Sequence, residues 1–534
     1  MQASARERAE SAGETLHHFH GGLRLRHHKR ISCELPLLRC PLPPRLYIPL
    51  LQHAGREAEP LVTVGQKVFK GEVIARFDTP TPGFVHASTS GTVTAIARQA
   101  ISHPSGIDGQ CVVVKPDGLD RWHSAEPIAD WNTAEPATLC QRIQNSGIVG
   151  LGGAVFPTSK KVNEARSSGI HTLILNGAEC EPYISCDEML MRECPGKIIN
   201  GARVLQRAVE AQKVIIAIED QMGEVFEILQ TAIDNQTRAG ILLVKVTTIY
   251  PEGGEKQLIQ VLTGLEVPAG GKPMDLGLLC VNVATAAAIA DAVIEGKPLV
   301  ERVVTVSGKG IRRPRNLLAL VGTPIACLVD QCGGYTRDAA RLVIGGPMMG
   351  YALASDQNPV VKAANCVLAL NEEDIRPAQK EMPCIRCGEC ARVCPAQLMP
   401  QTLNWQIRNE LYDQAADFGL DECIECGCCD FVCPSHIPLV EWFRFGKSEL
   451  RTLAIERTQA RLAKQRFEAR ETRLERLKRE RSKRMEEKKQ ALRDEAGKKL
   501  NIAAALSRVK AREQAAKAEK PARRLEDKGE AGEP

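Results

Sequence analysis

The sequence predicts a multidomain chain that combines α/β and α+β modules, and three observations lead to this fold class. The chain has 534 residues, which suffices for three or four domains at about 150 residues each. Strand-like and helix-like runs alternate between residues 138 and 300, as in βαβ units around a mainly parallel sheet. Nine of the 20 cysteines fall between residues 384 and 433, which predicts a separate domain built on clustered thiols.

Composition and charge are those of a soluble globular chain with one unusual end. The apolar share is 43%, the charged share 25% and the aromatic share only 4%. Residues 451–534 contain 26 Lys and Arg against 15 Asp and Glu, so the formal net charge of +5 arises from this tail. The N-terminus has no apolar signal-peptide core, which favours a reducing compartment. Clustered cysteines there indicate metal binding and not disulfides.

A membrane span is not expected. The longest weakly polar stretch, residues 276–294, contains Asn282, Thr285 and Asp291. A spanning helix needs about 20 apolar residues without such groups. We therefore interpret this stretch as a buried helix.

The first two segments are an N-terminal segment and a β domain. Residues 1–34 are polar, rich in His and Arg, and contain the phrase Phe19-His20-Gly21-Gly22. Residues 35–125 change to short Val, Ile and Thr runs punctuated by Gly and Pro, which predict a small β-sandwich. These runs resemble the hammerhead, or barrel-sandwich hybrid, fold of biotinyl and lipoyl carriers. The expected hairpin tip, residues 78–83, has no lysine to modify, so we expect a structural domain and not a swinging arm.

The next two segments are the α/β domain, residues 126–300, and a compact α+β domain, residues 301–365. In the first, strand-like runs at 172–175, 214–218 and 241–246 alternate with helical segments at 201–210, 224–235 and 256–262. The second has short strands and turns, including the phrase GGPMMG at 345–350. Its size is that of a β-grasp (SLBB-like) domain.

The last two segments are the cysteine domain, residues 375–450, and a basic tail, residues 451–534. Leu403, Ile407 and Leu411 lie four apart and predict a helix between the two halves of the cysteine cluster. The tail is expected to be helical or disordered, with a flexible solvated helix as the default. It also contains one series of apolar residues spaced seven positions apart, and a single series of this kind does not make a coiled coil.

The cysteine cluster contains the same motif twice. Four cysteines follow C-x2-C-x2-C-x3-C-P in each copy, and the copies begin 39 residues apart, at Cys384 and Cys423. In two-cluster ferredoxins the fourth cysteine of each copy ligates the other cluster. The pattern therefore assigns one [4Fe–4S] centre to Cys384, Cys387, Cys390 and Cys433, and the other to Cys423, Cys426, Cys429 and Cys394.

The second copy offers one extra thiol, at Cys428. Only Cys429 preserves both the x2 and the x3 spacing, so Cys428 is predicted to be a bystander. The alternatives are structural zinc sites or unpaired core thiols. Zinc favours two separated pairs of ligands, whereas two intact quartets with trailing prolines match the cluster template. Such clusters carry one electron at a time, so another site must supply the electrons.

A glycine-rich loop at residues 147–161, GIVGLGGAVFPTSKK, is the first candidate for that site. Gly150, Gly152 and Gly153 let backbone N–H groups approach a phosphate, and Lys160 or Lys161 adds positive charge. A Rossmann loop requires a third glycine where Val155 stands, so that interpretation fails. On spacing alone, a phosphate loop and a plain turn describe this stretch equally well.

The loop resembles the flavin loop of the flavoprotein subunit of respiratory complex I, G-R-G-G-A-G-F-P-T-G-x-K, with departures at Leu151, Val155 and Ser159. Three more phrases follow in that family's order: 176–182 resembles N-A-D-E-S-E-P, 250–255 resembles Y-I-C-G-E-E, and 281–285 resembles N-N-V-E-T. The resemblance implies that non-covalent FMN is bound by residues from all four phrases: Gly150, Gly152, Gly153, Lys161, Asn176, Glu179, Glu255, Asn282 and Thr285. It also implies that Glu181 lies near the nicotinamide of NAD(H). Ala178 and Gly254 replace acidic residues of that family.

The order of all these pieces resembles the C subunit of the Rnf-type (Rsx) electron transport complex, over residues 15–450. The resemblance implies a peripheral subunit on the cytoplasmic face of a bacterial inner membrane, docked on subunits A, B, D, E and G. It implies a translocase-type oxidoreductase that couples electron transfer between NAD(H) and ferredoxin to ion translocation. A flavin can exchange a hydride with NADH and pass single electrons to the two clusters, so no catalytic protein base is required.

Two other functions stay open, together with the partner of the tail. One is a soluble flavin and iron–sulfur NADH dehydrogenase subunit of the complex I flavoprotein type, although that family carries a single C-terminal cluster. The other is a non-catalytic electron-relay scaffold, suggested by Leu151, Ala178 and Gly254. The tail could contact anionic lipid. Nucleic acid is not expected as a partner, because Phe467 is the only aromatic residue after position 450.

Overall fold

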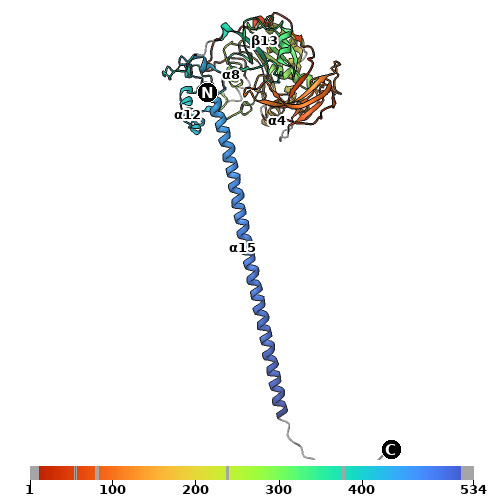
Figure 1. Ribbon diagram of the computed structural model, residues 1–534, viewed down its shortest axis with the longest axis vertical. Helices are drawn as coiled ribbons and strands as arrows, with labels where there is room; N and C mark the ends of the chain where they lie inside the picture. The colour runs from red at the N-terminus through yellow and green to blue at the C-terminus, as the bar shows by residue number, and fades with distance from the viewer. Residues whose placement is uncertain are drawn as a thin grey trace, which may run out of the picture. The chain divides into compact units, whose positions relative to one another are not determined.

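The computed structural model describes residues 11–52, 55, 57–77, 83–124, 126–235, 240–375 and 379–518. The chain divides into two units, residues 1–449 and residues 450–534 (Figure 1). The predicted hairpin tip at residues 78–83 lies, except for Gly83, outside the described residues. The mixed α/β architecture and the order of its modules confirm the predicted fold class.

The β-sandwich consists of a four-stranded and a three-stranded sheet. The larger sheet has the order β2-β8-β7-β4, and the smaller has the order β3-β5-β6. Inward-facing Ile, Leu and Val side chains from both sheets, such as Ile48, Ile74 and Val112, form one core between them. The strands are β2 (Leu46–Pro49), β3 (Glu59–Pro60), β4 (Lys67–Val68), β5 (Val73–Arg76), β6 (Phe84–His86), β7 (Gly91–Ala100) and β8 (Asp108–Pro116).

The α/β domain is built on a four-stranded parallel sheet in the order β11-β10-β9-β12. Its strands are β9 (Thr172–Gly177), β10 (Lys213–Glu219), β11 (Ile241–Val246) and β12 (Leu278–Asn282). Successive strand residues pack alternately into two cores, one shared with α6 and α9 and the other with α8. Burial on both faces explains why these strands are almost continuously apolar. The helices are α3 (Pro136–Asn145), α4 (Thr158–Ser168), α5 (Cys186–Glu193), α6 (Pro195–Val209), α7 (Gly223–Asp234), α8 (Glu255–Thr263), η1 (Pro273–Leu276) and α9 (Val283–Ile294).

The prediction of one buried helix over residues 276–294 is wrong. The stretch begins with strand β12 and continues as helix α9, with Asn282 between them. The Asn282 side chain accepts hydrogen bonds from the N–H groups of Ala284 and Thr285 and so caps the helix. A continuous apolar run does not distinguish a buried strand from a buried helix. In the described residues, no helix is both long and apolar enough to span a bilayer.

A six-stranded mixed sheet forms the β-grasp domain, in the order β1-β14-β13-β17-β15-β16. It takes in β1 from the N-terminal region and β17, which begins after residue 365. Val304, Leu317 and Val367 from three neighbouring strands join α10 in its core. The elements are α2 (Arg30–Cys33), β1 (Leu38–Arg39), β13 (Glu301–Ser307), β14 (Arg315–Leu320), α10 (Ile325–Gln331), β15 (Ala339–Ile344), β16 (Tyr351–Leu353), β17 (Cys366–Asn371) and η2 (Glu372–Asp374).

The cysteine domain consists of short helices, and a long helix follows it. The predicted helix between the two cysteine motifs is present as α12 but ends before Leu411. The elements are α11 (Glu389–Arg392), α12 (Pro400–Arg408), α13 (Tyr412–Asp417), η3 (Leu420–Glu422), α14 (Cys428–Val432) and α15 (Leu439–Ala518) (Figure 1). Along α15, pairs such as Lys464–Glu468 and Arg476–Glu480 lie one turn apart, which supports a solvated charged helix. The predicted helical tail is thereby confirmed as far as residue 518.

Candidate functional site

The order in which strands are added to the parallel sheet reverses between β9 and β12. Strands β10 and β11 follow β9 on one side, and β12 lies on its other side. At such a switch point, helices leave the carboxyl ends of the strands in opposite directions and open a crevice where ligands bind. Asn176 is the last but one residue of β9 and Asn282 the last residue of β12, and their Cα atoms are partners in the register. Two residues predicted to contact the flavin therefore lie side by side at this edge.

The glycine-rich loop covers the same edge. The Leu151 N–H donates to the Thr285 hydroxyl (2.9 Å), and a Cβ on Gly152 would lie 3.5 Å from the Asn282 side chain. Gly153 has φ +112°, where glycine is strongly favoured. The loop leads directly into α4, which begins at Thr158. The predicted residues of the loop and of β12–α9 thus form one surface.

Lys161 and Glu255 bring opposite charges to this surface. The Lys161 ammonium lies 2.6 Å from a Glu255 carboxylate oxygen and donates to the Cys280 carbonyl (2.6 Å). Glu255 is the first residue of α8, where the helix dipole favours an anion. The side chains of Lys161 and Glu255 are 23% and 39% exposed, so both remain accessible to a bound molecule.

Asn176 connects the sheet edge to the segment before α8. Its amide nitrogen donates to the Gly253 carbonyl (2.9 Å), and its amide oxygen accepts from the Ala178 N–H (3.0 Å). A Cβ on Gly253 would lie 2.3 Å from the Ala178 carbonyl oxygen, so this close approach requires glycine. The edge is therefore a preformed cradle of backbone and amide groups beside one lysine.

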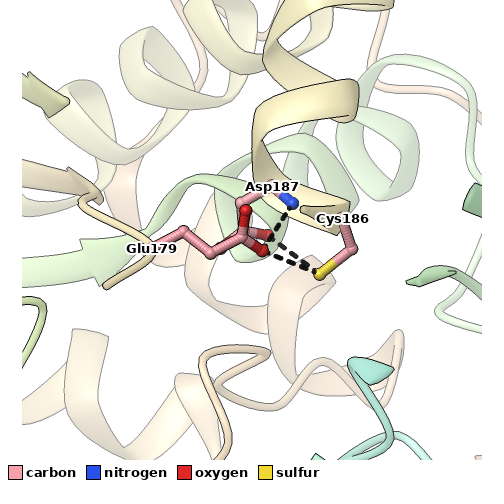
Figure 2. A group of neighbouring side chains, drawn as sticks. All are labelled: Glu179, Cys186 and Asp187. Atoms are coloured by element: carbon pink, nitrogen blue, oxygen red, sulfur yellow. Dashed lines mark hydrogen bonds between the residues drawn. The ribbon is translucent and has the colours of Figure 1, made fainter. Parts of the chain in front are cut away.

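Glu179 is buried at the start of α5, where its side chain lies beside those of Cys186 and Asp187 (Figure 2). Its carboxylate accepts from the N–H groups of Asp187 (3.0 Å) and Glu188 (3.3 Å), and the Cys186 thiol donates to it (3.2 Å). The Lys29 ammonium lies 3.7 Å from it. Burial raises the pKa of Glu179 to about 7 against the opposing charge of Lys29. Glu179 thus caps the helix, while its expected contact with the flavin stays a prediction.

Among the described residues, Glu179, Cys186 and Asp187 form the one group whose ligand atoms lie close enough together to hold a single metal ion. Donors already surround these atoms, because Asn282 donates to Asp187 (2.5 Å) while the helix N–H groups and Lys29 satisfy Glu179. Burial raises the pKa of the Cys186 thiol well above its usual value. The group therefore fits a satisfied helix cap better than a metal centre.

Glu181 lies at a junction between domains. Its carboxylate accepts from the N–H groups of Met348 (2.7 Å) and Met349 (3.0 Å) in the GGPMMG loop. A Cβ on Gly346 would lie 2.0 Å from the Glu181 side chain, which explains the glycine at that position. Burial raises the pKa of Glu181. The resemblance expects this residue near the nicotinamide, and that role stays a prediction.

The two cysteine motifs have matching backbones. Arg386, Gly388 and Gln397 have positive φ in the first copy, and the residues 39 positions later, Glu425, Gly427 and His436, have positive φ in the second. Left-handed conformations turn the chain sharply, so that closely spaced cysteines can face a common point. The sequence repeat is thus also a structural repeat.

The second copy surrounds a cavity, which we call the buried quartet site after Cys394, Cys423, Cys426 and Cys429. All four line it, with Cys428 and apolar residues such as Leu398, Val440 and Phe443. It therefore unites Cys394 of the first motif with three cysteines of the second, as the crossed assignment requires. Cys428 lines the same cavity and is fully buried, so the choice between Cys428 and Cys429 rests on the spacing.

The other four predicted ligands, Cys384, Cys387, Cys390 and Cys433, form what we call the exposed quartet. Cys384 and Cys387 are exposed, and Cys390 and Cys433 are half-buried. The Arg386 N–H donates to the Cys384 sulfur (3.4 Å), and the Cys390 thiol donates to Gln401 (3.4 Å). Three of the four cysteines of the buried quartet are buried and Cys423 is half-buried, whereas the exposed quartet lies at the surface of the same domain.

Three residues at the site were not identified as functional from the sequence. Tyr250 donates from its hydroxyl to the Cys426 carbonyl (2.5 Å), and Lys29 lies between Glu179 and Glu219. His20 donates to the Cys394 carbonyl (3.0 Å). The phrase around Gly21 and Gly22 was the only sequence signal for the N-terminal contacts.

Comparison with family models agrees with these modules. A model described as the RnfC barrel sandwich hybrid domain matches residues 17–119, and one described as the Nuo51 FMN-binding domain matches residues 143–291. An SLBB domain matches residues 303–352, and a 4Fe-4S dicluster domain matches residues 383–437. The predicted flavin and iron–sulfur modules are thereby confirmed.

Several similar curated proteins are named as the C subunit of the ion-translocating oxidoreductase complex. The protein of this name from Edwardsiella ictaluri is 47% identical, covering 87% of this chain and 58% of that protein. The Pseudomonas aeruginosa protein is 44% identical over 86% of this chain and 59% of its own length. The Pectobacterium atrosepticum protein is 43% identical over 94% and 71%.

Among the first of these relatives, the chain thus spans less than two thirds of their length. Among solved structures, an NAD+-reducing [NiFe]-hydrogenase in the H2-reduced state is similar, with a TM-score of 0.41 and 19% identity. That likeness covers 57% of this chain and 61% of the hydrogenase chain.

Proposed function

The chain belongs to the C-subunit family of the ion-translocating oxidoreductase complex, and from this premise we propose that it transfers electrons between NAD(H) and a redox partner through FMN and two [4Fe–4S] clusters. The observation that carries the proposal is that the flavin edge of the sheet and the buried quartet belong to one compact unit, in contact through Tyr250. The substrate NAD(H), with ferredoxin at the other end of the electron path, is part of the proposal.

The residues at the switch point fit a flavin mononucleotide. Open backbone at Gly153, the N-termini of α4, α8 and α9 and the Lys161 ammonium suit a phosphate and its ribityl chain. Bound FMN would exchange a hydride with NADH and pass on single electrons, which the clusters carry one at a time. The chain contributes by binding and orienting these groups, and we assign it no catalytic acid or base.

The two quartets suggest an order. The buried quartet contacts the segment that leads to Glu255, whereas the exposed quartet presents cysteines to the solvent. We assign the inner position of the electron path to the buried quartet and the outer position to the exposed one. A redox partner would then meet the exposed quartet.

The complex and its location extend the same proposal. We infer a peripheral subunit of a membrane-bound translocase, on the cytoplasmic side of a bacterial inner membrane, docked on the other Rnf/Rsx subunits, A, B, D, E and G. The names of the relatives support a complex of several subunits. The basic residues of α15 would add attraction to anionic lipid of about 1 kcal/mol per Lys or Arg near the surface.

The test is an anaerobic iron, sulfide and flavin assay on the full chain, followed by mixing with NADH. We expect about eight iron and eight sulfide per chain, one FMN, and bleaching of both chromophores by NADH. A chain that holds its iron but no flavin would be the non-catalytic relay. A chain with flavin and about four iron would support the complex I flavoprotein type instead.

A further inference from the structure

Two cysteine carbonyls of the buried quartet receive hydrogen bonds from outside the cysteine domain. The Tyr250 hydroxyl donates to the Cys426 carbonyl over 2.5 Å, and the His20 ring donates from Nδ1 to the Cys394 carbonyl over 3.0 Å. Tyr250 lies in the flavin-edge phrase 250–255, and His20 lies in the N-terminal segment. Each of the two motifs that contribute cysteines to the buried quartet is thus held by one donor from outside the cysteine domain.

The N-terminal segment is held firmly at this point. The Gly22 N–H donates to the Val393 carbonyl over 3.0 Å. Gly21 has φ +75°, and a Cβ there would lie 2.5 Å from the Val393 oxygen. Any larger residue would push the segment away from Cys394.

Tyr250 and the N-terminal segment form a single frame. Leu23 and Tyr250 exchange two backbone hydrogen bonds, of 2.7 and 2.9 Å. Tyr250 is only 2% exposed and packs with Cys180, Val393 and Cys428. Displacement of one donor is therefore transmitted to the other, because a dense apolar core does not deform locally.

The contacts of the exposed quartet are of another kind. The Cys384 sulfur accepts from the Arg386 N–H, and the Cys390 thiol donates to Gln401, so both partners belong to the cysteine domain itself. The frame therefore acts on one quartet and leaves the other to its own domain. A change confined to the buried quartet would therefore indicate a role in positioning, whereas a change at both quartets would indicate a general role in folding.

We propose that Tyr250 and His20 are positioning residues that clamp the Cys426 and Cys394 loops of the buried quartet against the flavin edge of the sheet. The proposal rests on the proposed function, since it deepens the link between the two sites. The rate of electron transfer between two groups falls as their separation grows, so a buried quartet displaced from the flavin edge would be reduced more slowly. The clamp fixes that separation without touching the substrate.

The experiment compares the anaerobically purified full chain with its Tyr250→Phe and His20→Ala variants. Tyr335→Phe is the matched control, because its hydroxyl contacts Asp356 in the β-grasp domain (3.2 Å). Three quantities are measured: amide hydrogen exchange of peptides that cover residues 393–397 and 424–428, the midpoint potential of each cluster, and the separate rates of flavin and cluster bleaching after mixing with NADH.

For Tyr250→Phe we expect about tenfold faster exchange in 424–428, as loss of one hydrogen bond implies, together with slower cluster bleaching. The rate of flavin bleaching and the potential of the exposed quartet should stay as in the wild type, and Tyr335→Phe should change none of these values. His20→Ala should act in the same direction on peptide 393–397. If Tyr250→Phe loses iron, His20→Ala becomes the deciding variant under the same criteria.

The proposal is overturned if both variants keep wild-type exchange and wild-type cluster bleaching, or if both quartets change equally. If the proposed function is wrong, the result is different, because NADH then does not bleach the flavin of the wild type. In that case hydrogen exchange and the two midpoint potentials still decide whether the clamp exists.

Discussion

The buried and the exposed quartet share a motif and a backbone but differ in their surroundings. Positive φ recurs 39 residues apart, at Gly388 and Gly427 among others, so the loops that present the cysteines are copies. Around Cys426 lie Tyr250, Cys428 and apolar side chains, whereas Cys384 and Cys387 are exposed to solvent. Solvent exposure and hydrogen bonds to the sulfurs set the potential of such clusters. The repeat thus gives both sites the same loop geometry, while the neighbouring domains give each site different surroundings.

The largest expected effect separates the two sites directly. Cys426→Ser and Cys387→Ser should each lower the iron content from about eight to about four per chain. NADH should still reduce the remaining cluster in Cys387→Ser, because the buried quartet contacts the flavin edge. In Cys426→Ser, dithionite but not NADH should reduce the remaining cluster rapidly. Iron analysis and EPR after each reductant measure this, and identical behaviour of the two variants would contradict the assigned order.

A moderate effect should distinguish the sites by pH. Burial, followed by the charges of Glu219 and Asp220, raises the pKa of Glu252 to about 8. One of its oxygens is buried without a hydrogen-bond partner within the described part of the chain. A raised carboxyl pKa stabilises the fold fully below the unfolded value, near 4.5, and this stabilisation disappears as the pH rises through about 8.

Glu252→Gln should therefore flatten the decline of the urea midpoint between about pH 5 and 9. Loss of the buried-quartet EPR signal along each urea titration gives that midpoint. Because Glu252 is two residues from Tyr250, the signal of the buried quartet should respond more than that of the exposed one. Parallel curves for the wild type and the variant would exclude this carboxyl as the cause.

The smallest effect concerns the extra thiol. Cys428→Ser should keep about eight iron per chain, whereas Cys429→Ser should lose the buried cluster. The pair is matched, since both thiols line the same cavity and both are buried. Iron analysis with EPR measures the difference. Loss of iron in Cys428→Ser with retention in Cys429→Ser would reverse the assignment.

Features encoded by residues close together in the sequence could be predicted, whereas features that depend on tertiary contacts could not. Cysteine spacing and the alternation of apolar runs are local patterns, so the sequence alone predicts the motifs and strands β9–β11. The interpretation of residues 276–294 as one helix was wrong because burial on both faces erases periodicity. Glu179 lies in a phrase that resembles one of a flavin site, yet its carboxylate caps α5. Only the tertiary fold shows that direction, as it does the contacts of His20 and Tyr250.

The position of Cys394 also affects how the protein is made. Its cavity partners Cys423 and Cys429 lie far downstream, and the first motif in turn awaits Cys433. A chain still emerging from the ribosome at residue 422 has four of these thiols and no closed cage. With the predicted crossed assignment, we therefore expect cluster insertion to follow synthesis of both halves.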